Sequence, residues 1–560
     1  MSRRAAITSL TLLSLLFAGL GMAQAWRDAP TWDEGIYIAS GVTTLTRHQI
    51  RLNLEHPPLA KVVAALPALL AHPDVPKGES WERGEQFSYT DEFVDAQVAA
   101  GKLQKVVFLA RLIPLAEAVA IGALLYMLAA ALFGRAAGVL AGGVWLTTPV
   151  VLGLGHLDTI DVPFTLVTLI ACLALHRGLH RPSWSSVLLL GLACGLTLLV
   201  RTTGLVLTGA IVVALIAGCW GAWGWGGLLR GAAVGFVAWA SVWVGVRALA
   251  PFPERVAADQ QLQVQGEVLE EPPRMARVIA AAGWPPEYAA GIRYLARVSF
   301  TPAPTFLLGQ SWEGARLWYW PGSMLVKLPL PVLAVLLGGL VCWKTLDPPT
   351  RRRAMFVLWV PGAALAAFTV TQPRPLGLRY LLPVIALWLA AASPLVTVAR
   401  TVSGRVAFAV IAAAQVAILV SSSPHSLAWT SPPFRPGYRF ATDSNLDWGQ
   451  DFYRLQQWAR GRAPMVAYFG GPGLSVEDIP GARPLLGADV ASVEGWVAAS
   501  ASFLTAYQRQ ELAWLRKYCP VGTIAGTILV YWFERPPDST PGPSAPAPPC
   551  RTGPSRVTSG

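Results

Sequence analysis

Charged side chains are scarce in this sequence. Only 14% of its 560 residues are Asp, Glu, Lys or Arg, against 54% that are hydrophobic, and the mean hydropathy is +0.46. A soluble domain does not need so much apolar surface, so these proportions favour a polytopic membrane protein. The 44 basic residues exceed the 32 acidic ones and give a net charge of +12. They are scattered through short loops, which the positive-inside rule explains better than nucleic-acid binding does.

Motifs for several kinds of enzyme chemistry are also missing. The sequence contains no P-loop, no Rossmann glycine fingerprint, no HExxH and no zinc-type pair of CxxC motifs. No internal repeat is evident either. A transporter built from two related halves would show such a repeat, so its absence disfavours that class.

Long apolar runs predict about eleven spanning helices. The first, 5–25, ends in a sequence similar to a signal-peptidase site, but its apolar run is longer than a usual signal core, and we expect it to remain uncleaved. The others are expected near 104–132, 137–154, 160–176, 186–200, 204–219, 231–249, 323–343, 354–371, 380–399 and 405–421. One long helix or a re-entrant hairpin is the alternative for the pair 186–200 and 204–219.

Loop charges predict the orientation of these helices. Arg and Lys gather in alternate connections, which are therefore cytoplasmic; they include Arg3, Arg4, Arg135, Arg181, Arg230, Lys344, Arg351 and Arg400. Eleven spans then leave the N-terminus inside and the C-terminus outside, in a multi-pass protein of the cell inner (plasma) membrane. The long loops 26–103 and 250–322 fall on the outer side.

The expected fold is an all-α membrane domain, residues 1–424, followed by a small outer α/β domain, residues 425–535. In the outer domain, 465–469 and 523–533 are predicted to be strands and 505–518 a helix. Residues 536–560 are rich in Pro, Ser and Gly and are expected to form a disordered tail.

An acidic pair, Asp33 and Glu34, follows the first helix directly. Two carboxylates at a membrane face can supply a general base and a partner for a metal ion or a hydrogen bond. Thr31 and Glu34 also have the spacing of a helix capping box, so a purely structural role fits these residues equally well.

A second cluster of ionisable residues lies where the fourth predicted helix begins. His156, Asp158 and Asp161 fall within six residues at its outer mouth. Asp158 can cap the helix. A histidine with carboxylates can also bind a divalent metal ion, so both interpretations stay open.

Cations also gather toward the outer face. Arg111 and Glu117 lie six residues apart in the second helix, so their side chains do not share a face of it. The deeper Glu117 is expected to hydrogen-bond another helix. Lys327 can snorkel to the headgroups or hold an anion. Arg201 and Arg379 complete the set of cations near this face.

The order of these motifs resembles the family 39 glycosyltransferases, GT-C membrane enzymes that include protein O-mannosyltransferases and aminoarabinose transferases. The matching motifs are Asp33-Glu34 after the first helix, His56-Pro57-Pro58-Leu59, Arg111-Leu112, Asp161 at the start of the fourth helix, and Arg379-Tyr380-Leu381-Leu382-Pro383. The stretch DSNLDWGQD, Asp443 to Asp451, is similar to a motif of bacterial members described as phospholipid carrier-dependent glycosyltransferases.

The resemblance implies inverting transfer of a sugar from a polyprenyl-phosphate donor to an outer acceptor, which is a protein, lipid or glycan. Asp33 matches the family's catalytic acidic position, Glu34 its partner, and Asp161 its second acidic position. Glu55 and His56 match a pair involved with metal and lipid phosphate in aminoarabinose transferases, although His56 replaces a lysine there.

The residues fit this chemistry independently. An inverting transfer needs a carboxylate base beside the acceptor, which Asp33 can supply, and cations on the leaving phosphate. The candidate substrate-binding residues are Glu55, His56, Arg111, Arg201, Lys327 and Arg379, and the candidate ligands of a divalent metal ion are Glu55, His156 and Asp158. The alternatives are a lipid or sugar transporter or flippase, and an inactive relative that acts as a scaffold.

Overall fold

The computed structural model describes residues 2–252, 274–534 and 536–537. Most of the predicted tail 536–560 and the stretch 253–273 of the outer segment lie outside the described residues. Within the described ranges, eight helical segments are long and apolar enough to cross a membrane: α1 (Arg3–Arg27), α6 (Leu103–Phe133), α9 (Asp161–His180), α11 (Gly204–Trp223), α12 (Gly226–Leu249), Pro348–Val370 with α18 (Pro348–Ala354) and α19 (Val360–Val370), Leu378–Val398 with α20 (Leu382–Ala392), and α21 (Val402–Ser422). The predicted multi-pass helical fold is confirmed.

The other three predicted spans also contain helices. α10 (Trp184–Val200) and α17 (Leu330–Cys342) are short, while α7 (Arg135–Leu146) and α8 (Pro149–Gly155) meet at 63°. The interruption therefore lies within 137–154, which the sequence predicted as one straight span. At this break the hydroxyl of Thr148 donates to the carbonyl of Val144 at 2.6 Å. Pro149 follows and has no N–H to continue the helical hydrogen bonds.

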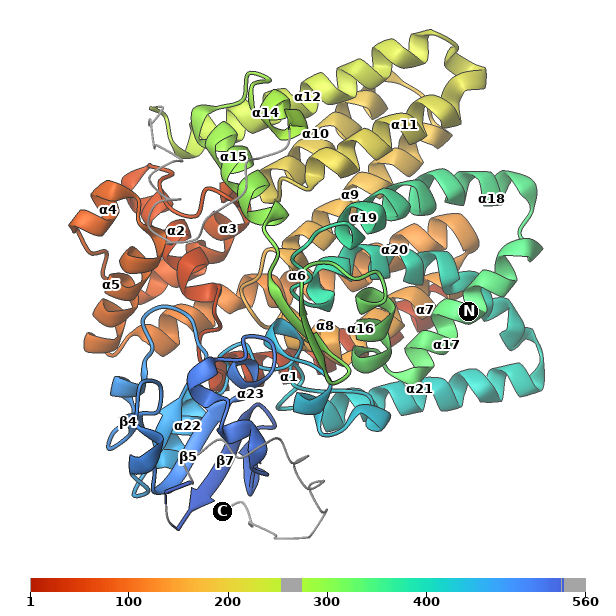
Figure 1. Ribbon diagram of the computed structural model, residues 1–560. Coiled ribbons are helices and arrows are strands. Elements are labelled where there is room, and N and C mark those ends of the chain that lie inside the picture. Colours follow the sequence, from red (N-terminus) through yellow and green to blue (C-terminus); the bar gives the residue numbers. More distant parts are fainter. Residues whose placement is uncertain (1, 253–273, 535, 538–560) are drawn as a thin grey trace.

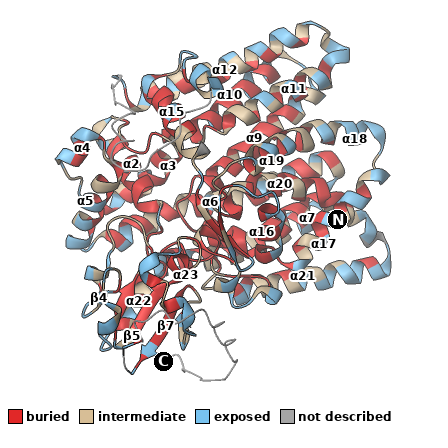
Figure 2. Ribbon diagram, viewed as in Figure 1, coloured by how far each residue is buried: buried red, intermediate tan, exposed pale blue. Residues whose placement is uncertain are grey.

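Small residues bring the helices of the bundle close together. A Cβ atom on Gly142 of α7 would lie 2.5 Å from the carbonyl oxygen of Gly122 on α6. Trp145, fully buried, donates its indole N–H to the carbonyl of Ala118 at 2.9 Å. Buried residues fill the spaces between helices (Figure 2). Apolar side chains on the outside of α1 and α12, among them Leu15 and Phe236, are exposed, as lipid-facing surfaces are.

The long outer segments form helices of their own. The first gives α2 (Glu34–Arg47), α3 (Pro58–Ala68), α4 (Glu79–Arg83) and α5 (Gln86–Ala99); the second gives α14 (Arg274–Ala280), α15 (Pro286–Phe300), the hairpin β1 (Pro304–Leu307) and β2 (Gln310–Glu313), and α16 (Tyr319–Lys327). Helices α2 to α5 lie at the same end of the bundle as the C-terminal sheet, and the N-terminus lies toward the opposite end (Figure 1).

A five-stranded sheet dominates the C-terminal region. Its order is β4 (Arg483–Pro484), β3 (Met465–Ala467), β5 (Gly495–Ser500), β7 (Ile528–Phe533) and β6 (Gly522–Ile524), with α22 (Phe452–Ala459) and α23 (Ala501–Leu504) beside it. Strand β3 runs parallel to β4 and β5, whereas β7 pairs antiparallel with β5 and β6. The predicted sheet-containing region is confirmed.

Two details of this region differ from the prediction. The segment 523–533 is not one strand but the hairpin of β6 and β7, whose turn has Ala525 and Gly526 at positive φ. The predicted helix 505–518 was wrong, because its described backbone forms two 3-10 turns, Gln510–Leu512 and Leu515–Lys517. Leu512 and Leu515 are both buried, and their spacing of three residues suits a 3-10 turn.

Candidate active site

A cavity of about 1070 Å³ lies where the outer helices meet the C-terminal region. It is lined by residues from α2, α5, α9, α15, α19 and α20, and by the loop 469–478. The structure brings six of the predicted site residues together in its wall: Asp33, Glu55, His56, Asp161, Arg201 and Arg379. Five others are outside the described cavity lining, namely Glu34, Arg111, His156, Asp158 and Lys327.

Asp33 stands at the start of α2 with its carboxylate toward the cavity. The side chain is 20% exposed and accepts hydrogen bonds from Arg379 Nη1 at 2.7 Å and from the Tyr37 hydroxyl at 3.2 Å. In the described part of the chain, this side chain forms no hydrogen bond that caps α2. Sequence reasoning missed Tyr37, although its position one helical turn after Asp33 is the signal for such a contact.

Arg379 connects the two predicted acidic positions. Its Nη1 contacts Asp33, and its Nε lies 3.9 Å from Asp161 Oδ2. Asp161, at the first residue of α9, also pairs with Arg201. The guanidinium of Arg379 lies 4.2 Å above the ring of Trp448. Charges of alternating sign therefore line this part of the cavity, where an anion can exchange places with a carboxylate.

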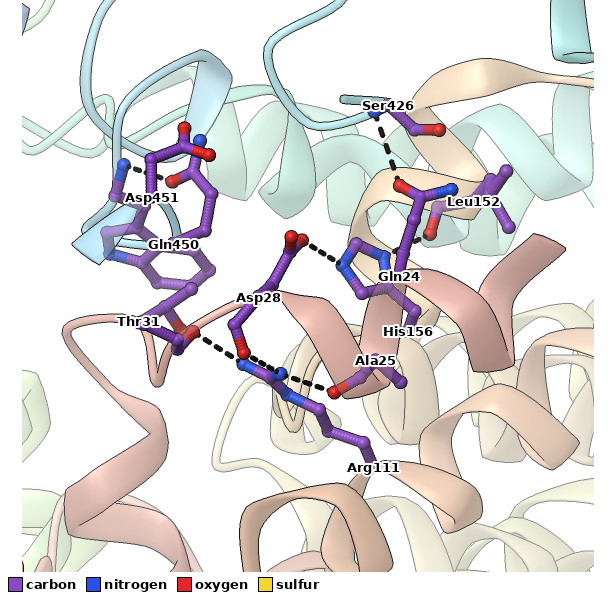
Figure 3. A network of polar contacts seen from close by, with 12 residues as sticks. Gln24, Ala25, Asp28, Thr31, Arg111, Leu152, His156, Ser426, Gln450 and Asp451 are labelled. Carbon is purple, nitrogen blue, oxygen red and sulfur yellow. Dashed lines mark hydrogen bonds and ion pairs between the residues drawn. The ribbon is translucent and has the colours of Figure 1, made fainter. Parts of the chain in front are cut away.

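Glu34 points away from the cavity into a fully buried ion pair with Arg111. Arg111 donates to the Glu34 carboxylate from Nε at 2.7 Å and from Nη2 at 2.6 Å. Its remaining N–H groups donate to the backbone carbonyls of Ala25, Asp28 and Ala29. All five donors of the guanidinium are thus engaged. Arg111 fixes the chain between α1 and α2, and Figure 3 shows its bond to the carbonyl of Ala25.

Glu34 also forms the predicted contact with Thr31. Its carboxylate accepts from the Thr31 N–H at 2.8 Å and from the Asp158 N–H at 2.7 Å. Burial by itself would raise the pKa of Glu34, but the Arg111 charge and these hydrogen bonds hold the pKa below its usual value. In this conformation the Glu34 carboxylate therefore contacts Arg111, Thr31 and Asp158 rather than the cavity.

The predicted metal ligands are not assembled into one group. In the part of the chain that the structure describes, no three His, Cys, Asp or Glu side chains are placed to hold a metal ion. His156 Nε2 instead lies 2.9 Å from Asp28 Oδ2 (Figure 3). Asp28 Oδ1 lies 2.8 Å from Arg454 Nη2 of α22. Burial, reinforced by the charge of Glu34, raises the pKa of Asp158 well above its usual value.

Lys327 contacts backbone carbonyls in this conformation. Its ammonium group, fully buried at the end of α16, donates to the backbone carbonyls of Leu427 and Trp429. These bonds tie α16 to the chain that follows α21. Neither headgroup snorkelling nor a phosphate contact is needed to explain its place.

Glu55 and His56 lie in a turn that Lys61 of α3 organises. Lys61 Nζ donates to the carbonyls of Asn53 at 2.6 Å and His56 at 2.8 Å, and Asn53 Nδ2 donates to Glu55 Oε1 at 2.8 Å. Burial and the nearby cations Arg201 and Lys61 lower the pKa of His56 well below its usual value, so this ring is a neutral group in the cavity wall.

Glu55 is expected to make stability depend on pH. Burial raises its pKa from 4.5 to about 7, with Lys61 opposing and Asp33 adding to the shift. The folded protein then holds this proton more tightly than the unfolded chain, so the stabilisation is present below pH 4.5 and is lost as the pH rises through about 7. The loss is at most about 3 kcal/mol.

Glu55→Gln should flatten this dependence. We expect the unfolding temperature of the purified wild-type protein to fall between about pH 4.5 and 7 more steeply than that of Glu55→Gln. Above this range Lys61, whose pKa burial lowers to about 7, contributes with the opposite sign. Parallel curves for the two proteins below pH 7 would show that Glu55 keeps an ordinary pKa.

Comparison with known proteins places part of this site in a family. Residues 100–244 match the family model described as dolichyl-phosphate-mannose-protein mannosyltransferase. This range contains Arg111, Asp161 and Arg201. No curated protein matches the chain.

Solved structures similar to this chain include those of two proteins. ArnT from Cupriavidus metallidurans, in the apo state and bound to undecaprenyl phosphate, is 14% identical, with 94% of this chain and 98% of that chain covered and a TM-score of 0.33. The archaeal oligosaccharyltransferase AglB from Archaeoglobus fulgidus, in complex with an inhibitory peptide and a dolichol-phosphate, is 13% identical, with 94% and 74% covered and a TM-score of 0.45. The resemblance predicted from the sequence motifs is confirmed by the family-model match over residues 100–244.

Proposed function

We propose that this protein is an inverting membrane glycosyltransferase that moves a sugar from a polyprenyl-phosphate donor to an acceptor on the outer side of the membrane. The ion pair between Asp33 Oδ2 and Arg379 Nη1 in the cavity wall, at 2.7 Å, is the observation that carries the proposal. It places a carboxylate able to take a proton beside a cation able to hold a phosphate. The family description, which names a dolichyl-phosphate sugar, supports the donor class.

The proposed reaction uses these groups in turn. The donor phosphate binds Arg379 and Arg201 and releases the Asp33 carboxylate from its ion pair. Asp33 then takes the proton of the acceptor hydroxyl or amine as that atom attacks the anomeric carbon. The bond from this carbon to the phosphate oxygen breaks on the opposite face, the electron pair leaves with the phosphate, and the two guanidinium groups stabilise the negative charge that develops there. Asp161 keeps Arg379 and Arg201 oriented.

The wall of the cavity suits two different substrates. The part of the wall formed by α15 and α19 is largely apolar and includes Leu295, Val298, Leu365 and Phe368. The same cavity is lined by the cations Arg201 and Arg379, so this side fits a lipid phosphate. The lining from α5 and the loop 469–478 carries Asp91, Asp95, Glu477 and Asp478. We propose that the donor enters on the first side and the acceptor on the second.

The proposal is tested with purified protein in liposomes that contain a polyprenyl-phosphate-linked sugar. Arg379→Ala is expected to reduce transfer by about a hundredfold or more and to weaken use of the donor more than use of the acceptor, because the developing phosphate charge loses its nearest cation. Arg316→Ala is the control, since Arg316 stacks on Trp312 outside the described cavity lining. Unchanged donor dependence in Arg379→Ala would contradict the assignment, and movement of lipid without sugar transfer would favour a flippase.

We also propose the orientation predicted from the loop charges, with the N-terminus in the cytoplasm and residues 425–535 outside the cell inner membrane. The N-terminus and the C-terminal sheet lie toward opposite ends of the bundle, which supports it (Figure 1). A reporter fused after Phe533 is expected to be active only outside. A cytoplasmic signal would contradict the orientation and place the cavity on the wrong side for an outer acceptor.

A further inference from the structure

We infer that the DSNLDWGQD motif, residues 443–451, is a positioning element for the pair formed by Asp33 and Arg379. The motif lies in the C-terminal region, yet it binds both of the membrane-domain segments that carry these two residues. The inference rests on the proposed function, because it explains how that pair is held. It assigns a role to a motif that otherwise serves only as a family resemblance.

The first contact is with the segment that leads into Asp33. The backbone N–H of Trp32 donates to the carbonyl of Trp448 at 3.0 Å, and that of Ala29 donates to the carbonyl of Gln450 at 2.9 Å. The Gln450 side chain accepts from the Trp448 N–H at 2.8 Å. Residues 29–32 are thus held by backbone hydrogen bonds immediately before Asp33.

The second contact is with the segment that leads into Arg379. Asn445 Oδ1 accepts from the backbone N–H of Leu378 at 2.9 Å, and the Ser444 hydroxyl donates to the carbonyl of Leu376. Between them lies Gly377, at φ +102, where an added Cβ would lie 2.3 Å from Ser444 Oγ. The motif and the Arg379 segment therefore approach too closely for any residue but glycine at this point.

Trp448 joins the two contacts. Its carbonyl binds the Asp33 segment, and its ring lies under the guanidinium of Arg379 with 4.2 Å between Cζ and the ring centroid. It is 2% exposed and lines the cavity. A cation over an indole face is restricted in its direction, so the ring holds Arg379 where it can reach Asp33.

Other residues of the motif bind the C-terminal region itself. Asp447 accepts from the backbone N–H of Ser502 at 3.0 Å, and Asp451 accepts from the Thr527 hydroxyl at 2.7 Å. The motif therefore has two sets of contacts, one anchored in the sheet-containing region and one on the site. This division is what a positioning element requires, and a motif that only filled the domain core would not need the second set.

The experiment compares Trp448→Leu, Trp448→Phe and Asn445→Ala with wild-type protein in the liposome assay. A displacement of reacting groups by about 1 Å typically costs about a hundredfold in rate. We expect Trp448→Leu and Asn445→Ala to lower kcat by roughly tenfold to a hundredfold with little change in the KM for the acceptor. Trp448→Phe, which keeps an aromatic face, should recover part of the loss. Trp458→Leu is the control, since Trp458 packs on Trp496 within the same region.

Hydrogen exchange gives a second readout that does not depend on activity. Asn445→Ala is expected to speed exchange at Leu378, and Trp448→Leu at residues 29–36, while Trp458→Leu leaves both segments as in the wild type. Wild-type kcat in the two motif variants, or exchange unchanged at both segments, would overturn the inference. An equal loss in Trp458→Leu would also overturn it, because the motif would then serve only domain stability. Failure of wild-type protein to transfer sugar would reject the proposed function, and the exchange results would still decide whether the motif holds the two segments.

Discussion

Replacing Asp33 by Asn is expected to slow sugar transfer by about a hundredfold to ten-thousandfold while leaving the protein folded and inserted. The amide keeps the size of the side chain and can still accept a hydrogen bond from Tyr37, which donates to Asp33 at 3.2 Å. It cannot accept the proton of the acceptor. The described Asp33 side chain makes no capping bond to α2, so the loss will not come from the start of the helix.

Two controls separate catalysis from helix capping. Glu92→Gln removes a carboxylate of α5 that lies outside the described cavity lining, and it is expected to keep most of the activity. Thr31→Ala removes the hydroxyl that donates to Glu34 at 3.0 Å, and it should lower stability by about 1 kcal/mol with little effect on rate per folded molecule. Rates are measured on protein quantified after purification. A wild-type rate for Asp33→Asn would remove Asp33 as the base.

The sequence located Asp33, Asp161 and Arg379 at helix ends on one side of the membrane, and the structure brings them into one cavity. This was predictable because hydropathy and loop charge are local signals, and a short motif at a helix end stays there whatever the helix packs against. The 3.9 Å approach of Arg379 to Asp161 was not predictable, since it depends on how α9 and the start of the α20 segment pack.

The sequence did not separate the roles of the two adjacent acids. Asp33 and Glu34 have similar chemistry and neighbouring positions, but consecutive residues of a helix point in different directions. Glu34 turns inward to Arg111, 77 positions away in the chain. No local pattern shows such a partner, so pairing between distant segments decides which carboxylate faces the cavity.

The same limit explains the placement of two predicted phosphate-binding cations. Arg111 and Lys327 looked equivalent to Arg379 because each is a single cation near the outer end of an apolar run. In the structure they donate to backbone carbonyls: Arg111 to those of Ala25 and Asp28 at the end of α1, and Lys327 to those of Leu427 and Trp429 after α21. A buried carbonyl that lacks a helical partner attracts a nearby cation, but the sequence does not show which carbonyls these are.

Breaking the buried pair of Glu34 and Arg111 is expected to have the largest effect on stability. Both side chains are fully buried, and the pair is bidentate, with contacts of 2.6 and 2.7 Å. Removing one partner leaves an uncompensated buried charge, which typically costs about 3–5 kcal/mol. Arg111→Met should therefore lower the unfolding temperature strongly or prevent accumulation in the membrane. Arg111→Lys keeps the charge but offers three donors in place of five, so we expect an intermediate loss.

The comparison with an exposed ion pair makes the test specific. Arg83 and Glu79 form a pair on the surface of α4, with side chains 60% and 74% exposed, and Arg83→Met should change the unfolding temperature little. Thermal unfolding in detergent and the amount of protein in isolated membranes measure both effects. Glu34→Gln decides between a structural and a catalytic carboxylate: a structural role predicts lower stability, with normal turnover by the molecules that remain folded. Wild-type stability with lost turnover would instead make Glu34 part of the chemistry, since a buried ion pair that held the fold cannot be removed without that cost.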